Sequence, residues 1–229
     1  AMKLADYVVN ESGFGADLGA EKFFDIVMPS SGHKPSAAVL IATVKALAAH
    51  GATPEMPVTN DPGALQRGLC NLGRHLANMR KFNIPVVVAI NRFPSDTPEE
   101  LEAIARYCEE AGVQSALVEA YAKGGEGATD LATKVVALAE QSDTSQIQPI
   151  YEASLTLEEK VTRISKEIYG ADGVYFESEG RKKLRKFTSL GFGHYPVCMA
   201  KTSSSFTDNP KLAGAPSGWT LTVTDANLS

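Results

Sequence analysis

Three stretches of strand length are apolar throughout and lack the alternation of apolar and polar residues that marks a strand with one face in water. They are residues 37–43, 85–91 and 196–200. Strands buried on both faces have this pattern, and they occur in parallel sheets with helices above and below. Shorter apolar stretches predict further strands at residues 6–9, 116–120 and 219–223.

Helical periods separate these strands. The longest covers residues 62–82, where leucines and a methionine recur at steps of three and four. Thr97, Pro98 and Glu100 have the spacing of a capping box with proline in the first turn, so a helix is expected to begin there and to end at Gly112. Similar periods predict helices at residues 130–140, 156–169 and 178–190.

The order of these elements predicts an α/β fold. Residues 1–145 are expected to form a mostly parallel sheet flanked by helices, which is the ligand-binding segment. The polar, Ser- and Gln-rich residues 141–149 favour a boundary. Residues 146–229 are expected to form a smaller α+β unit in which two helices precede two strands.

Composition excludes several classes of protein. The net charge of −5, from 22 basic and 27 acidic residues, argues against a nucleic-acid partner. No apolar run is long enough to span a membrane, and there is no signal peptide, so the cytoplasm is the expected location. The three cysteines and four histidines lack the spacing of a metal site, and we expect all three cysteines to be buried. Neither a phosphate-loop motif nor a G-x-S-x-G motif occurs.

Ligands bind parallel sheets outside the carboxyl ends of the strands, so the loops that follow strands are the candidate site. In residues 91–97, Asn91 offers an amide and Phe93 a ring for a heterocycle; a polar strand end with Phe93 packed inward explains the pattern equally well. In residues 121–127, Tyr121 and Lys123 precede Gly124 and Gly125, which suits an anion-binding loop or a plain surface turn.

Two other loops that follow predicted strands are also candidates. Residues 10–17 place Phe14 between two glycines, as either an aromatic binding face or a tight turn. Residues 201–205 join a lysine to hydroxyl side chains, which suits either an anion site or, more simply, a solvated loop.

Taken together, several of these segments resemble formate–tetrahydrofolate ligase (formyltetrahydrofolate synthetase). The segments that carry the resemblance are residues 5–9, 13–25, 85–97, 124–127, 168–172, 191–193 and 196–202. They run along nearly the whole chain.

The resemblance implies a phosphate-loop nucleoside-triphosphate fold and a reaction that makes 10-formyltetrahydrofolate, ADP and phosphate from formate, tetrahydrofolate and ATP through formyl phosphate. It implies that Phe93 stacks on folate and that Tyr121, where the family usually has tryptophan, forms the other half of a ring clamp. Phe14, Pro94 and Leu117 match positions that line the neighbouring cleft. Mg²⁺, a monovalent cation and a homotetramer are also expected of the family.

The resemblance also implies that the phosphate loop, and the arginine that positions formyl phosphate, lie upstream of the segment that this chain matches. Phosphoryl transfer depends on such groups. We therefore expect no catalytic residue and no ligase activity in this chain alone, and we expect the phosphate-loop half to be its partner. The alternative is a non-catalytic paralogue or partner subunit that binds folate or nucleotide.

Overall fold

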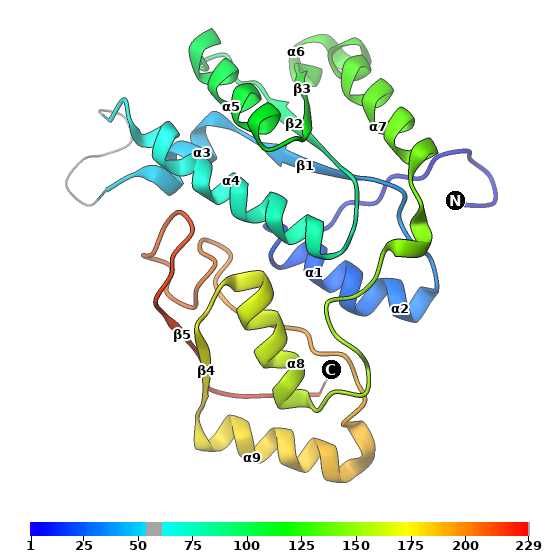
Figure 1. The fold of residues 1–229 in the computed structure, drawn as a ribbon, viewed down its shortest axis with the longest axis vertical. Helices are drawn as coiled ribbons and strands as arrows, with labels where there is room; N and C mark the ends of the chain where they lie inside the picture. Colours follow the sequence, from blue (N-terminus) through cyan, green and yellow to red (C-terminus); the bar gives the residue numbers. More distant parts are fainter. Residues whose placement is uncertain (54–60, 229) are drawn as a thin grey trace.

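The computed structural model describes residues 1–53 and 61–228. Its main sheet has three parallel strands, β1 (Ala38–Ala42), β2 (Val86–Asn91) and β3 (Gln114–Val118), in the order β1-β2-β3 (Figure 1). The predictions at residues 37–43 and 85–91 are confirmed. The strand predicted at 116–120 begins two residues earlier, at Gln114, and ends at Val118, because Ala120 already starts the next helical turn.

Helices cover both faces of this sheet, which confirms the α/β class. On one face, α3 (Val44–Gly51), α4 (Ala64–Lys81) and α5 (Pro98–Glu110) form a core with Val88 and Ile90 of β2. On the other, α7 (Thr129–Gln141) packs on β2 and β3. The side chains of neighbouring residues in a strand point to opposite faces, so Val87 and Ala89 lie under α7.

The predicted helix ends are largely confirmed. Thr97 and Glu100 form the capping box at the start of α5, and Gly112 follows its end with a φ of 68°. The helix predicted from residue 62 begins at Ala64, with Gly63 as its cap; the Asp61 carboxylate accepts the Gly63 N–H at 3.0 Å.

Two predicted strands are wrong. Residues 6–9 and 196–200 have no regular structure, and Val9 is 94% exposed. An apolar segment becomes a strand only where another strand pairs with its backbone, and within the described residues neither segment has such a neighbour. Side chains bind the backbone of residues 193–197 instead. The Lys160 ammonium donates to the carbonyls of Gly193 and Tyr195, and the Val197 N–H donates to the Tyr151 hydroxyl.

The C-terminal third has a different order from the one predicted. α8 (Leu157–Ile164) continues through a π-helical turn (Ser165–Tyr169), and then β4 (Gly173–Phe176), α9 (Ser178–Phe187), a further turn (Thr188–Phe192) and β5 (Thr220–Val223) follow. β4 and β5 pair in parallel. A strand therefore lies between the two helices, which gives an alternating arrangement instead of the expected two helices followed by two strands.

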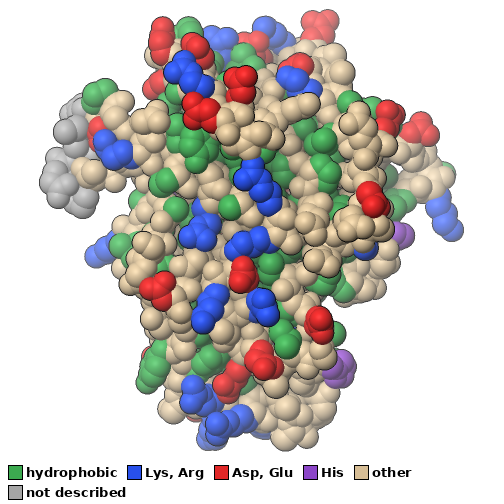
Figure 2. All heavy atoms as spheres, viewed as in Figure 1, with side chains coloured by type: hydrophobic (Ala, Val, Ile, Leu, Met, Phe, Trp, Pro, Cys, Tyr) green, Lys and Arg blue, Asp and Glu red, His purple; other side chains and the backbone are tan. Residues whose placement is uncertain are grey.

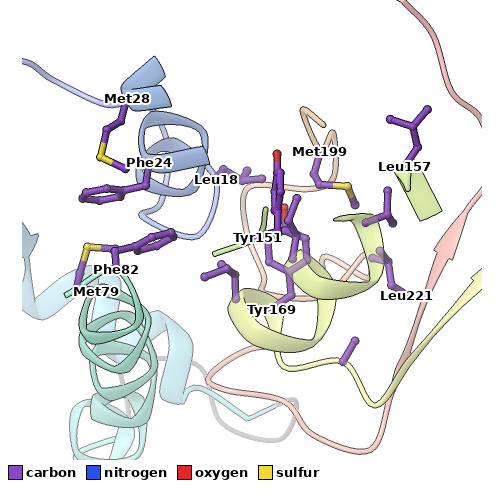
Figure 3. Packing of buried hydrophobic residues seen from close by; sticks show 14 of the residues in the cluster. Leu18, Phe24, Met28, Met79, Phe82, Tyr151, Leu157, Tyr169, Met199 and Leu221 are labelled. Atoms are coloured by element: carbon purple, nitrogen blue, oxygen red, sulfur yellow. The ribbon is translucent and has the colours of Figure 1, made fainter. Parts of the chain in front are cut away.

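One hydrophobic core joins the N-terminal helix to the C-terminal third. That helix is continuous from α1 (Gly19–Lys22) through a π-helical turn (Phe23–Val27) to α2 (Met28–Ser31). Phe24 stacks on Phe82, the residue after α4, with ring centroids 4.4 Å apart, and Tyr169 belongs to the same cluster (Figure 3). The short 3₁₀ turn Thr144–Gln146 leads to Ile147, which is fully buried in this core.

The surface carries mixed charge. On the face drawn in Figure 2, Lys and Arg side chains are interspersed with Asp and Glu. Among the described helices, none has both the length and the hydropathy needed to cross a bilayer. Cys108 is buried as predicted, but Cys70 and Cys198 are exposed, because they fall on the solvent side of α4 and in an irregular segment.

Candidate functional site

The carboxyl ends of β2 and β3 lie side by side. Asn91 is the register partner of Val118, and the Arg92 N–H extends the ladder by donating to the Val118 carbonyl at 3.0 Å. Phe93 and Tyr121 follow these positions by two and three residues. The two loops that the sequence singles out therefore leave the sheet from adjacent points on one edge.

The Phe93 loop is held in shape by a buried carboxylate. Asp96, only 8% exposed, accepts the Phe93 N–H at 2.8 Å, and its own N–H donates to the Phe93 carbonyl at 3.0 Å. The capping box of α5 begins at the next residue. This tight turn leaves the Phe93 ring 47% exposed, and Pro94 is exposed beside it.

The Tyr121 loop closes on its own backbone. Tyr121 lies in the single turn α6 (Ala120–Lys123) and is 98% exposed; a 3₁₀ turn (Gly124–Ala128) follows. The Glu119 N–H donates to the Gly127 carbonyl at 2.9 Å. A Cβ on Gly127 would lie 2.5 Å from the Glu119 carbonyl group, and Gly124 has a φ of 60°, so glycine is required at both positions.

Glu119 connects the two loops electrostatically. Its carboxylate accepts a hydrogen bond from the Arg92 guanidinium at 2.9 Å and also forms an ion pair with the Lys123 ammonium. The hydrogen bond from Lys123, supported by the charges of Lys123 and Arg92, holds the pKa of Glu119 below its usual range. Lys123, predicted as an anion-binding residue, thus has a carboxylate partner in this structure.

Phe14 lies in the loop that precedes α1. It has a φ of 63°, which non-glycine residues adopt rarely, and it is 82% exposed. Its loop is anchored by Asp17, whose carboxylate is 2.7 Å from the Lys201 ammonium, with both side chains almost fully buried. Lys201 is therefore an internal ion-pair partner, not part of a solvated loop. Among the described residues, no hydrogen bond or ring pair joins Phe14 to Phe93 or Tyr121.

Most of the predicted site residues thus lie in the two loops at this edge, whereas Phe14 belongs to the loop before α1. Those at the edge are Asn91, Phe93, Pro94, Leu117, Tyr121, Lys123, Gly124 and Gly125. A hollow of about 640 Å³ lies elsewhere, at the amino end of β3, where Gln114, Ser115 and Lys134 line it. The predicted site is consequently an exposed surface with two rings, separate from that hollow.

Sequence reasoning missed three residues that shape this site: Asp96, Glu119 and Gly127. Asp96 directly precedes the cap residue Thr97, which is a usable signal for a side chain that turns back on its loop. Glu119 and Gly127 had no such signal, since their contacts depend on how β2 and β3 are paired.

A second group of titratable side chains is buried away from this edge. Glu21 is fully buried, and its burial, reinforced by the charge of Asp25 one helical turn away, raises its pKa to about 9. Burial raises the pKa of Asp25 to about 6, although Asp25 accepts the Ile150 N–H at 2.7 Å. Burial lowers the pKa of His75 to about 4. Among the residues with described positions, no three His, Cys, Asp or Glu side chains are grouped to hold a metal ion.

Comparison with known proteins identifies the family of this chain. A family model described as formate–tetrahydrofolate ligase matches residues 1–229. A curated formate–tetrahydrofolate ligase from Beijerinckia indica subsp. indica is 50% identical over 231 residues, which cover 100% of this chain and 41% of that relative. The chain therefore spans about two fifths of the length of that relative. With the family model matching throughout, the chain belongs to the formate–tetrahydrofolate ligase family.

Proposed function

We propose that this chain is the folate-binding portion of a formate–tetrahydrofolate ligase, which joins formate to tetrahydrofolate at the expense of ATP. One observation carries the proposal: two exposed aromatic rings, Phe93 and Tyr121, stand in adjacent loops at the carboxyl edge of a parallel sheet. Exposed rings on rigid supports are suited to a planar heterocycle, which gains from stacking on both of its faces. The pterin ring of tetrahydrofolate is such a heterocycle.

Each part of the edge has a task in this proposal. Phe93 and Tyr121 contact the two faces of the pterin, and Asn91 offers its amide to the polar edge of the ring. The Arg92–Glu119–Lys123 group fixes the spacing of the two loops before substrate arrives. Pre-organisation of this kind reduces the entropy lost on binding.

The proposal also includes a cleft for the nucleotide next to the folate. Phe14, Pro94 and Leu117 would line the cleft next to the folate, and backbone N–H groups at Gly124 and Gly125 would face phosphate. Lys123 would bind phosphate only after its ammonium leaves the carboxylate of Glu119. The described residues provide no cluster of metal ligands, so we assign no step to Mg²⁺ or to a monovalent cation.

We assign no catalytic residue to this chain. Formyl phosphate chemistry needs groups that neutralise and align phosphoryl oxygens, and in the family resemblance those groups belong to the phosphate-loop half. The proposed reaction thus requires that half as a partner, whether it lies in the same polypeptide or in another.

The test is calorimetry with tetrahydrofolate. We expect measurable binding by the chain. The affinity should be roughly two- to tenfold lower in Phe93→Ala and in Tyr121→Ala, because losing a stacked aromatic contact costs about 0.5–1.5 kcal/mol in addition to the loss of buried surface area. Tyr175→Ala is the matched control, since Tyr175 is a 60% exposed ring on the other sheet. If both site variants bind as tightly as the control, the ring clamp is wrong.

A turnover assay addresses the alternative of a non-catalytic binding subunit. With formate, ATP and tetrahydrofolate, we expect no product from the chain alone and product once the phosphate-loop half is added. Product from neither sample would favour the non-catalytic alternative.

A further inference from the structure

Arg92 and Lys123 hold a single carboxylate between them. The Arg92 guanidinium donates to Oε1 of Glu119 at 2.9 Å, and the Lys123 ammonium contacts Oε2, so each oxygen has its own cation. The pKa of Glu119 is lowered, chiefly by the hydrogen bond from Lys123, which shows that the position between the two cations favours an anion. The cations are also reachable from solvent, because their side chains are 40% and 56% exposed.

This group of three side chains carries one more positive than negative charge. Asp96, the other acidic residue of the Phe93 loop, is buried and accepts the Phe93 N–H, so it is engaged elsewhere. Glu126 is exposed in the neighbouring turn, and among the described residues no ion pair joins it to either cation. Glu119 is therefore the one carboxylate that the described ion pairs place on Arg92 and Lys123.

Only the side chain of Glu119 has to move for this carboxylate to leave. The Glu119 N–H donates to the Gly127 carbonyl at 2.9 Å, and the Glu119 carbonyl accepts the N–H groups of Ala122 and Lys123, each at 3.0 Å. These backbone hydrogen bonds close the Tyr121 loop without help from the carboxylate. Partly exposed ion pairs contribute little free energy, so an oxyanion brought by a ligand can replace the Glu119 carboxylate at small cost.

The two cations are close in sequence to the two exposed rings. Arg92 precedes Phe93, and Lys123 lies in the same single turn, α6, as Tyr121. Tetrahydrofolate and ATP each join a planar heterocycle to oxyanions, which are carboxylates in the glutamyl part of the first and phosphates in the second. Guanidinium and ammonium groups form their strongest hydrogen bonds with such oxyanions.

We propose that Arg92 and Lys123 form a subsite for an oxyanion of the bound ligand, and that the Glu119 carboxylate occupies this subsite until the ligand binds. The inference rests on the proposed function for the source of the oxyanion, a folate carboxylate or a nucleotide phosphate. Only a ligand with its own oxyanion compensates the two cations for the loss of Glu119. Glu119 is thus a specificity-determining residue that favours anionic ligands over neutral heterocycles.

A purely structural role for Glu119 is the competing explanation, and it predicts the opposite sign. If Glu119 served only to tie the two loops together, its replacement would weaken the binding of every ligand at this edge. If its carboxylate occupies an oxyanion subsite, its replacement removes a competitor and strengthens the binding of oxyanions.

The experiment measures the binding of two probes that lack both pterin and adenine. p-Aminobenzoylglutamate carries the carboxylates of folate, and inorganic tripolyphosphate carries the phosphates of a nucleotide. In Glu119→Gln, calorimetry at low salt should show about three- to fivefold tighter binding of at least one probe, and added NaCl should reduce this gain. Glutamine keeps the size of the side chain and an oxygen that accepts from Arg92.

Glu102→Gln is the matched control, because it removes an exposed carboxylate that is paired with Arg106 on α5 and changes the net charge by the same amount. It should bind both probes like the unmodified chain. Adding Arg92→Gln to Glu119→Gln should abolish the gain, since one of the two cations is then missing. Circular dichroism verifies that all variants fold.

The pattern of the gain identifies the source of the oxyanion. A gain with p-aminobenzoylglutamate alone assigns the subsite to folate, a gain with tripolyphosphate alone assigns it to the nucleotide, and a gain with both shows a general oxyanion subsite. Two results would overturn the proposal: Glu119→Gln binds neither probe more tightly than Glu102→Gln does, or the gain persists when Arg92 is also replaced. The probes contain no pterin, so a failed ring clamp leaves these outcomes interpretable.

Discussion

The guanidinium of Arg92 and the carboxylate of Glu119 meet at 2.9 Å across the ends of β2 and β3, and this contact ties the Phe93 loop to the Tyr121 loop. Glu119 has a second cation in Lys123. The pair is partly exposed, so its value lies in setting loop geometry more than in global stability.

Replacing Arg92 by Gln should weaken tetrahydrofolate binding without unfolding the protein. An exposed ion pair contributes at most about 1 kcal/mol, so we expect up to roughly fivefold lower affinity by calorimetry and an unfolding midpoint close to that of the unmodified chain. Arg106→Gln is the control, since Arg106 pairs with Glu102 on α5, away from the edge. Equal affinities for the two variants would show that the tie does not position the rings.

Replacing Lys201 by Met should strongly destabilise the fold. The change leaves the Asp17 carboxylate buried without its cation, and breaking a buried pair from one side costs about 3–5 kcal/mol. Urea unfolding measures the loss. The double variant Asp17→Asn with Lys201→Met should recover part of it, because no buried charge remains; a double variant no more stable than the single one would assign the loss to packing around Tyr169 instead.

Glu21 should make stability depend on pH. Its pKa is about 9 in the folded chain and about 4.5 when unfolded, so the unfolded state releases the proton first as pH rises. Stability from this group is full below pH 4.5 and is lost as pH rises toward about 9. Asp25, with a folded pKa of about 6, adds a similar decline at lower pH. Urea unfolding between pH 5 and 9 measures the slope.

Glu21→Gln should flatten that slope between pH 6 and 9, where Asp25 has already titrated. The variant should be the more stable protein at pH 9, by a margin on the order of a few kcal/mol. Glu126→Gln, which alters an exposed carboxylate, should retain the original slope. A slope that is unchanged in Glu21→Gln would mean that Glu21 is ionised in the folded protein.

The sequence predicted the part of the fold that depends on local pattern. Residues 85–91 form a strand whose continuous apolar character matches burial on both faces. Residues 37–43 also contain a strand, but Val39 and Ile41 are exposed, so burial on both faces is wrong there. Thr97 and Glu100 cap α5 through contacts three residues apart. The same pattern failed at residues 6–9 and 196–200, since apolar character indicates burial and says nothing about a pairing partner. β4 was missed, although it has the same four-residue length as β5, which was predicted.

The candidate site was predictable to a similar extent. Phe93 and Tyr121 follow strands, and the carboxyl-edge rule brings such loops together without further information. The Arg92–Glu119 contact requires the register of Asn91 on Val118, which no local pattern specifies. The loop of Phe14 likewise depends on a residue distant in sequence, because Asp17 in that loop pairs with Lys201.

Replacing Gly127 by Ala should disrupt the Tyr121 loop selectively. The new methyl group would lie 2.5 Å from the carbon and oxygen of the Glu119 carbonyl, and this is backbone that no side-chain rotation can move. Overpacking of this kind costs about 1–3 kcal/mol, and we expect the loop to open in order to relieve it, separating Tyr121 from Phe93 and weakening tetrahydrofolate binding. Gly125→Ala is the matched control in the same turn, because a Cβ there meets nothing within 4 Å. Calorimetry and hydrogen exchange at the Glu119 amide, which donates to Gly127, measure the two effects together. If Gly127→Ala kept both the folate affinity and the amide protection of Gly125→Ala, the closed loop would have no role in holding the ring clamp.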